Sequence, residues 1–214
     1  MVILNKPGNL SIKTLSKVLL MRVAKKLGIN QKDRELIMLL EENPDLPQNK
    51  IAKKLGLSQP SIGVRIRKLK EKKIISTKVV INLKELGLNV AKVDATVTSP
   101  TRIIDSFKGC PYFLRGFITS GKNNVCLFFA SEDLTTLEAL VEYHLRENPE
   151  VNSVELNIII DSEINLGFPI KMIIEKTEKA PCGCVCEKCE YYELHRCLGC
   201  PYTSAYRGSF WQEK

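Results

Sequence analysis

The chain has 214 residues, of which 44% are hydrophobic, so it is long enough for two modest domains with buried cores and is not globally disordered. No apolar run approaches the ~20 residues of a membrane-spanning helix. Lys13, Lys17 and Arg22 interrupt the N-terminal apolar positions, so we expect a cytoplasmic protein with neither a signal peptide nor a membrane partner. The net charge is +8, and residues 24–78 carry 14 Lys and Arg against 6 Asp and Glu, whereas residues 79–214 carry 14 against 18. This asymmetry favours a nucleic-acid-binding module joined to a sensing or partner-binding module.

Two amphipathic helices are predicted first. Residues 10–27 alternate apolar and basic positions at helical spacing, and we interpret them as a helix packed on the following domain. A dimer contact or a DNA-contacting arm is the alternative for this segment. A second helix is predicted over residues 31–43, with Asp33 as its expected cap and Asn43-Pro44 ending it.

Residues 47–75 predict two short helices joined by a tight turn. The first helix spans residues 48–55 with the small Ala52 where the helices cross, and Gly56 supplies a left-handed turn conformation. Ser58 is expected to cap the second helix. Spacing of i, i+4 and i+7 predicts one buried stripe on that helix, formed by Ile62, Ile66 and Leu69. This arrangement is a helix-turn-helix.

The other side of the second helix carries side chains suited to a DNA duplex. Its start offers residues short enough to reach base edges in a major groove, and its end is rich in cations for phosphates. A solvated basic face is the simpler alternative, since cations are favourable near a helix C-terminus. The predicted DNA-contacting residues are Gln59, Ser61, Val64, Arg65, Arg67, Lys68, Lys70 and Lys72.

The spacing of residues 30–80 matches a known family pattern. Its positions are occupied by Asp33, Leu36, Leu40, Ala52, Gly56-Leu57-Ser58, Arg65-Ile66 and Leu69. This pattern resembles the DNA-binding domain of the Lrp/AsnC (feast/famine) transcription regulators, although Lys73 replaces the usual glycine before the last isoleucine. The resemblance implies a winged helix-turn-helix that binds double-stranded DNA as a homodimer or higher homo-oligomer. Residues 77–82 alternate in polarity and predict a short strand pair or wing.

Residues 88–162 predict the element order β-α-β-β-α-β. The strands are expected at 90–98, 112–119, 125–130 and 151–160, with helices at 100–107 and 134–146. This is the order of the ferredoxin-like fold, and also that of the C-terminal sandwich of Lrp/AsnC proteins. The resemblance implies dimerisation and a small-molecule effector, an amino acid, near the turn between the second and third strands. The expected effector residues are Thr119, Ser120, Gly121 and Asn123; a plain hairpin turn is the alternative, because Asn123 or Asn124 stands where the family often has an acidic residue.

Some members of the superfamily decarboxylate tetrapyrroles, which gives an enzymatic alternative. That chemistry needs positioned His and Arg side chains over a large pocket. The one histidine of the predicted sandwich, His144, lies late on an amphipathic helix, where a surface or packing role is expected. We find no nucleophile–base pair, no phosphate-binding glycine loop and no two carboxylates at a spacing typical of acid–base catalysis. We therefore expect no catalytic residues and no enzyme.

Six of the eight cysteines lie close together near the C-terminus. They include two C-x-x-C pairs, each able to chelate a metal ion through two thiolates. A segment of 34 residues is shorter than the ~40 that usually fold without a cross-link or metal, and a reducing cytoplasm favours metal over disulfide. The predicted metal ligands are Cys182, Cys184, Cys186, Cys189, Cys197 and Cys200, whereas Cys110 and Cys126 stand apart in apolar surroundings.

The identity of the metal is read from the context of these cysteines. Pro201 directly after the last cysteine favours an iron–sulfur cluster of the [4Fe–4S] type, with zinc and a thiol/disulfide switch as alternatives. The expected ligands are the two C-x-x-C pairs, 186/189 and 197/200, with Cys182 or Cys184 as a substitute or a resolving thiol. His195 is a weaker candidate ligand.

The sequence thus predicts an α+β protein in five segments. They are an N-terminal helix (1–29), a winged helix-turn-helix (30–86), a ferredoxin-like βαββαβ sandwich (87–165), a linker (166–180) and a cysteine-rich tail (181–214). The predicted function is sequence-specific transcription regulation, responsive to redox state, iron or oxygen through the tail. An iron–sulfur electron carrier or scaffold protein is a further alternative.

Overall fold

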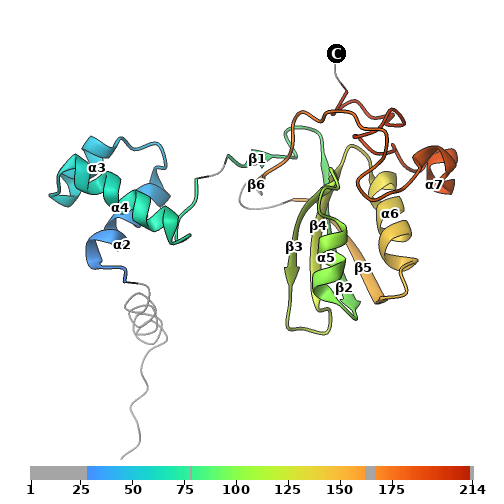
Figure 1. Cartoon of the computed structure of the whole chain (residues 1–214), viewed down its shortest axis with the longest axis horizontal. Helices are drawn as coiled ribbons and strands as arrows, with labels where there is room; N and C mark the ends of the chain where they lie inside the picture. The colour runs from blue at the N-terminus through green and yellow to red at the C-terminus, as the bar shows by residue number, and fades with distance from the viewer. Residues whose placement is uncertain (1–27, 78, 162–166, 213–214) are drawn as a thin grey trace, which may run out of the picture. The chain divides into compact units, whose positions relative to one another are not determined.

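The computed structural model describes residues 28–77, 79–161 and 167–212, and the chain divides into two compact units, residues 1–77 and 78–214 (Figure 1). Each unit has its own hydrophobic core. The helix predicted over residues 10–27 lies outside the described residues. Among the helices that are described, none is long and apolar enough to cross a bilayer.

Within residues 28–77, the described part of the first unit, there are three helices, α2 (Gln31–Glu42), α3 (Gln48–Leu55) and α4 (Gln59–Glu71). Gly56 has φ +63 and ends α3 in the left-handed conformation, and the Ser58 side chain accepts a hydrogen bond from the Ser61 N–H at the start of α4. The predicted helix-turn-helix is therefore confirmed in its turn, its cap and its core, which consists of Leu36, Ile51, Ala52, Leu55, Ile62 and Leu69.

The cap of α2 lies one turn earlier than expected. Asn30, not Asp33, is the N-cap: its Oδ1 accepts from the Asp33 N–H at 3.0 Å, and Asp33 Oδ2 accepts from the Asn30 N–H at 3.0 Å. Asp33 is the third helical residue of this reciprocal capping box, where its carboxylate satisfies a donor that the helix leaves unpaired.

The segment expected to form a wing belongs to the second unit. The structure describes no β-strand within residues 28–77. Instead, β1 (Ile81–Asn82) pairs antiparallel with β6 (Gly167–Phe168), and Leu83 and Leu88 pack with Phe168 in a small core. The boundary between the units therefore lies at 77/78 rather than at 86/87.

The second unit is built on a four-stranded antiparallel sheet. In chain order it contains β2 (Asn89–Val97), α5 (Pro100–Ser106), β3 (Phe113–Ile118), β4 (Val125–Ser131), α6 (Leu134–Val141) and β5 (Val151–Ile159). The strand order β3-β4-β2-β5 places the first strand between the third and the fourth, which confirms the predicted ferredoxin-like fold. Both helices contribute to one core with the sheet, as Ile103 of α5 and Leu137 of α6 are buried there with Val93 of β2.

The second predicted helix of the sandwich changes character near its end. α6 continues directly into a π-helical turn, η1 (Glu142–Arg146), rather than running as one α-helix to residue 146. Such single π-turns insert an extra residue per turn and frequently occur at functional sites. Here the turn carries Tyr143 and His144.

Residues 167–212 are part of the second unit and not a linker followed by a separate tail. Their short elements are β6, the 3₁₀ turn η2 (Cys186–Lys188) and α7 (Glu190–Glu193), and α7 lies beside α6 in Figure 1. Trp211 is buried against Tyr112 and Tyr206, and its Nε1–H donates to the Lys171 carbonyl at 2.7 Å. We call residues 181–200, which hold the six clustered cysteines, the cysteine segment.

Candidate nucleic-acid interface and cysteine-lined cavity

α4 presents one buried and one exposed side. Ile62 and Leu69 are buried in the core of the first unit, whereas Val64 is 59% exposed although it is apolar. Its exposed methyl groups are available for contact with a partner surface. Seven of the eight predicted DNA-contacting residues are exposed on this unit: Gln59, Ser61, Val64, Arg67, Lys68, Lys70 and Lys72.

A shallow hollow lies where α3 and α4 approach each other. Its lining includes Gln48 of α3 and Gln59, Val64 and Arg67 of α4. Gly63 permits this approach, because a Cβ there would lie 3.3 Å from Gln48 Oε1. The hollow therefore groups an amide pair, an apolar side chain and a guanidinium, all of which can contact base edges.

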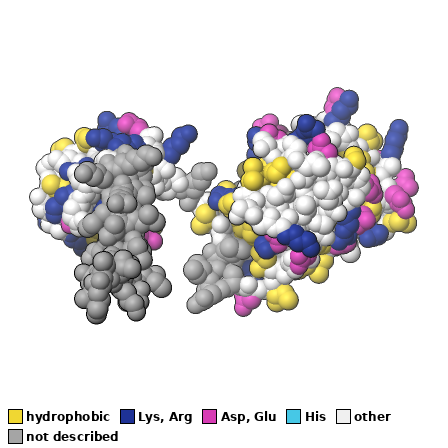
Figure 2. Space-filling view, turned by 90° about the horizontal axis from the view of Figure 1, so that it is seen from below, with side chains coloured by type: hydrophobic (Ala, Val, Ile, Leu, Met, Phe, Trp, Pro, Cys, Tyr) yellow, Lys and Arg dark blue, Asp and Glu magenta, His cyan; other side chains and the backbone are white. Residues whose placement is uncertain are grey.

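The charge around this helix is strongly positive. Residues 28–77 contain 11 Lys and Arg against 6 Asp and Glu. In the view of Figure 2, Lys and Arg side chains appear around this unit with some Asp and Glu among them. A basic surface of this kind attracts the phosphates of nucleic acids.

Arg65 has a different role from its neighbours on α4. Its Nη1 lies 2.6 Å from Asp33 Oδ1 and 3.3 Å from Asn30 Oδ1, so it ties α4 to the capping box of α2. The side chains of Arg65 and Asp33 are 27% and 12% exposed. This pairing joins residues 32 positions apart, which helical periodicity does not reveal.

The turn that was expected to bind an effector, residues 119–124, is hydrogen-bonded to the end of β2. Thr119, Ser120 and Gly121 are exposed, whereas Thr96 Oγ1 donates to Asn123 Oδ1 at 3.1 Å. The Asn124 amide exchanges two hydrogen bonds with the backbone of Val97, at 2.9 and 2.8 Å. These amides hold the hairpin in place, which is the structural role weighed against effector binding.

The second unit contains a cavity of about 60 Å³ that is lined by seven of the eight cysteines. Six come from the cysteine segment, and the seventh, Cys110, comes from the loop between α5 and β3. Cys126 does not line this cavity; it lies on β4, where it interacts with Asp94. Cys110 stands apart from the cluster in the sequence, but the fold brings its loop to the cysteine segment, and this was not predicted.

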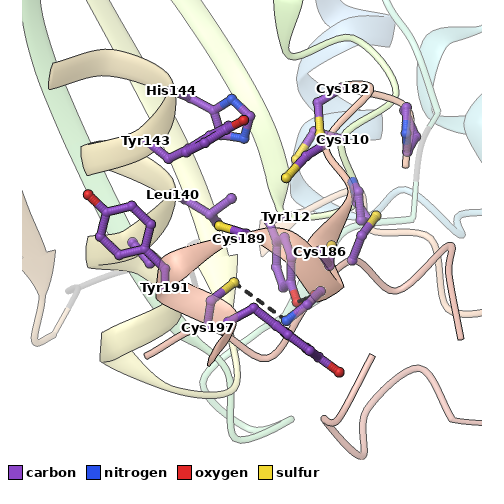
Figure 3. A pocket seen from close by; sticks show the side chains of 17 residues that line it. Cys110, Tyr112, Leu140, Tyr143, His144, Cys182, Cys186, Cys189, Tyr191 and Cys197 are labelled. Atoms are coloured by element: carbon purple, nitrogen blue, oxygen red, sulfur yellow. Dashed lines mark hydrogen bonds between the residues drawn. The ribbon is translucent and has the colours of Figure 1, made fainter. Parts of the chain in front are cut away.

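Aromatic and apolar residues form the rest of the wall. Figure 3 shows Leu140 of α6 with Tyr143 and His144 of η1, facing the cysteines across the cavity. His144 packs edge-on against Phe107 and Tyr143, and burial lowers the pKa of its imidazole, which favours the neutral form. His144 was expected to have a surface or packing role, and its place in the cavity wall was not foreseen.

Burial also sets the protonation of the thiols. It raises the pKa of Cys110, Cys184 and Cys200 to about 12 and that of Cys197 to about 11. Free thiols with such values are protonated at neutral pH and are poor nucleophiles, whereas a bound cation would offset the cost of forming thiolates. The Gly199 N–H already donates to Cys197 Sγ at 3.4 Å.

The backbone between the last two cysteines requires glycine. Gly199 has φ +82, and a Cβ there would lie 2.6 Å from the Ala205 carbonyl oxygen. This conformation allows Cys197 and Cys200 to line the same cavity. Within the residues that the structure describes, no three Cys, His, Asp or Glu side chains are already arranged to hold a metal ion. The donor set nevertheless fits a thiophilic metal, since seven soft sulfur donors share one cavity.

Several hydrogen bonds fix the C-terminal residues on the αβ domain. Tyr112 donates its hydroxyl proton to the Gly199 carbonyl, and the Leu198 N–H donates to Thr136 Oγ1 of α6 at 2.9 Å. Glu132 accepts from the Tyr206 hydroxyl and from the Ser209 N–H. The cavity is thus formed jointly by the αβ domain and the C-terminal residues.

Comparisons with known proteins agree with the fold of both units. A family model described as winged helix-turn-helix DNA-binding matches residues 29–76. The HTH-type transcriptional regulator LrpA of Pyrococcus horikoshii is 24% identical over 137 residues, which cover 62% of this chain and 97% of that protein. The regulatory protein AsnC of Haemophilus influenzae is 22% identical over 142 residues, covering 64% of this chain and 95% of that protein.

Two solved structures extend the comparison. Escherichia coli AsnC has a TM-score of 0.54 at 20% identity, covering 64% of this chain and 95% of that chain. Bacillus subtilis LrpC has a TM-score of 0.51 at 26% identity, covering 64% of this chain and 98% of that chain. More than a third of the present chain therefore has no counterpart in these relatives. Over its helix-turn-helix and αβ domains, the chain is similar to transcription regulators of the Lrp/AsnC type.

Proposed function

We propose that this protein is a sequence-specific DNA-binding transcription regulator in which α4 lies in the major groove. The observation that carries the proposal is the exposed side of α4, where Gln59, Val64 and Arg67 share a hollow at the junction with α3. The relatives named above are regulators, and the two matched domains account for nearly their whole length.

The side chains on α4 divide by chemistry into two groups. Gln59 can pair with an adenine edge, Val64 can contact a thymine methyl group, and Arg67 can reach guanine or phosphate. Lys68 and Lys70 follow on the exposed side and suit phosphate contacts. If a dimer contacts about 6–10 phosphates, its affinity falls by ~10³–10⁵ between 50 and 200 mM salt.

Assembly into a dimer or larger oligomer would supply two DNA-binding domains, one for each half-site of the DNA. Exposed apolar side chains on β3 and β5 support this part of the proposal, since Phe117, Ile118 and Ile158 offer apolar area to a second copy. An amino-acid effector at the β3–β4 turn remains a prediction, as does the absence of catalytic function.

We also propose that the cysteine-lined cavity holds a metal–sulfur centre, with a [4Fe–4S] cluster favoured over zinc. The support is the gathering of seven thiols, the aromatic wall and the backbone N–H directed at Cys197 Sγ. Such a cluster, when bound, supplies one-electron redox chemistry. The chain would hold it through cysteine thiolates, and Tyr143, Tyr191 and Tyr192 would limit the access of water.

The DNA-binding proposal is tested by fluorescence anisotropy with genomic duplex fragments at several salt concentrations. The variant Arg67→Ala/Lys68→Ala should bind more weakly, and the salt slope should fall by about 1 for each phosphate interaction that the substitutions remove. Lys122→Ala, an exposed change on the second unit, serves as the control for removal of a surface cation. Equal binding by all these proteins would rule out α4 as the contact surface.

The sensing proposal needs a separate comparison. Anaerobic, air-exposed and chelator-treated protein should bind the same selected duplex with different affinities. If all three bind equally, the metal–sulfur centre has a structural role and the regulator does not sense through it.

A further inference from the structure

Cys110 is the one cavity cysteine that does not belong to the cysteine segment. It lies in the short loop between α5 and β3, and its N–H donates to the Phe107 carbonyl at 3.0 Å. The Phe113 N–H donates to the Cys110 carbonyl at 3.2 Å. The backbone around Cys110 is therefore fixed by the αβ domain on both sides.

The cysteine segment is stacked on this same loop. Pro181 lies so close to Gly109 that a Cβ on the glycine would be 3.4 Å from the proline Cβ. Tyr112, two residues after Cys110, donates to the Gly199 carbonyl and packs edge-on against Trp211 at a ring distance of 5.5 Å. These contacts hold the Cys110 loop against both ends of the cysteine segment.

Cys110 lines the cavity together with other thiols, and it also packs against the edge of the sheet core. It lies close enough to Cys182, Cys197 and Cys200 for their charges to interact, and Figure 3 shows it beside Cys182. A buried cysteine often serves only as a small apolar side chain. Cys126 on β4 fits that description, because it lies outside the cavity that the other seven cysteines line.

We propose that Cys110 is a ligand of the metal–sulfur centre, so that the centre cross-links the αβ domain to the cysteine segment. This inference rests on the cofactor proposed above. Since no three side chains of the described residues are preset for metal, the segment thiols must move inward on binding, and Cys110 is the rigid point that they approach. A ligand set drawn from two parts of the fold ties the docking of the segment to the presence of the centre.

If the metal–sulfur centre cross-links the αβ domain and the cysteine segment, its removal should change the structure of the Cys110 loop as well as that of the segment. The αβ core is apolar and independent of the six segment cysteines, so it should remain folded. The cysteine segment and the Cys110 loop should loosen together, because both would lose ligand bonds to the same centre. A centre held by the segment alone would loosen the segment without changing exchange in the loop.

Cys110→Ser, Cys110→Ala and the matched control Cys126→Ala would be purified anaerobically as full chains. Iron, zinc and sulfide contents and the visible and electron paramagnetic spectra would be measured. Serine offers an oxygen ligand and alanine offers none, so Cys110→Ser should retain a centre with altered spectra, whereas Cys110→Ala should lose most of its metal. Cys126→Ala should match the wild type.

Hydrogen exchange of the wild type with and without metal gives a second readout that does not depend on any variant folding. Removal of metal should raise exchange in residues 108–113 and in the cysteine segment together. If the wild type holds metal and Cys110→Ala keeps the same content and spectra, the inference fails while the cofactor proposal stands. If the anaerobic wild type holds no metal, both the cofactor proposal and the Cys110 inference fail. The DNA-binding proposal is not affected by this result.

Discussion

Replacing Arg65 by alanine should destabilise the first unit without removing a DNA contact. The change deletes the ion pair between Arg65 Nη1 and Asp33 Oδ1, which are 2.6 Å apart. The Asp33 side chain is only 12% exposed, so it would keep a partly buried charge with one partner fewer. Loss of a hydrogen-bonding partner from such a group lowers the unfolding free energy by about 1–3 kcal/mol.

For a small domain, that loss corresponds to a decrease in melting temperature of roughly 4–24 °C. Native-state hydrogen exchange of α2 and α4 in the full chain measures the effect on this unit alone. Arg67→Ala is the matched control. Because Arg67 is exposed, this substitution should change the unfolding free energy of the first unit by less than about 0.5 kcal/mol. Its affinity for DNA should nevertheless fall.

A double-mutant cycle with Asp33→Asn isolates the pair, because asparagine keeps an acceptor for the Asn30 N–H. We expect a coupling energy of about 1 kcal/mol between the two positions. The reasoning is refuted if Arg65→Ala leaves exchange unchanged and weakens DNA binding as much as Arg67→Ala does. Arg65 would then be a contact residue, as the sequence predicted.

Three further predictions concern the second unit. Burial alone would raise the pKa of Glu132, but hydrogen bonds from Tyr206 and Ser209 outweigh burial and hold the pKa below 4.5. The Glu132 carboxylate therefore stabilises docking of the C-terminal residues above pH 4.5. This stabilisation is lost as the pH falls through the lowered pKa. Trp211 fluorescence should report this acid release in the wild type, and Glu132→Gln should already be released at neutral pH. Gly199→Ala, which forces a Cβ to 2.6 Å from the Ala205 oxygen, should lower metal content and speed proteolysis of the cysteine segment; unchanged proteolysis would contradict the strain argument. Chelation should raise hydrogen exchange in the cysteine segment but not in α2–α4, because the first unit has a separate core; equal loosening of both units would contradict this.

Local patterns in the sequence were sufficient for most of the fold. The left-handed Gly56 and the Ser58 cap depend on residues within a few positions of one another, and both are confirmed. The apolar stripe of α4 is confirmed at Ile62 and Leu69, which are buried, whereas Ile66 is partly buried. Alternating polarity likewise located the four main strands to within one or two residues. The ferredoxin-like strand order followed from the sequence of elements, since few topologies satisfy it.

The features that were missed depend on contacts between distant residues. Arg65 and Asp33 both fit the family pattern, yet nothing local indicates that they pair. Cys110 and the cysteine segment are separated by about 70 positions, and only the packing of Tyr112 against Gly199 and Trp211 brings them together. An isolated cysteine in apolar surroundings, next to the loop glycine Gly109, was the available sequence signal for a shared site.

The most direct test of the account is a titration of the isotope-labelled full chain with a selected duplex, followed through backbone amide chemical shifts. The largest shifts should fall on residues 59–72, with smaller ones at Gln48 and none in the core of the second unit. If duplex DNA leaves the α4 amides unmoved, or shifts mainly another surface, α4 does not lie in the groove and the regulator assignment is contradicted.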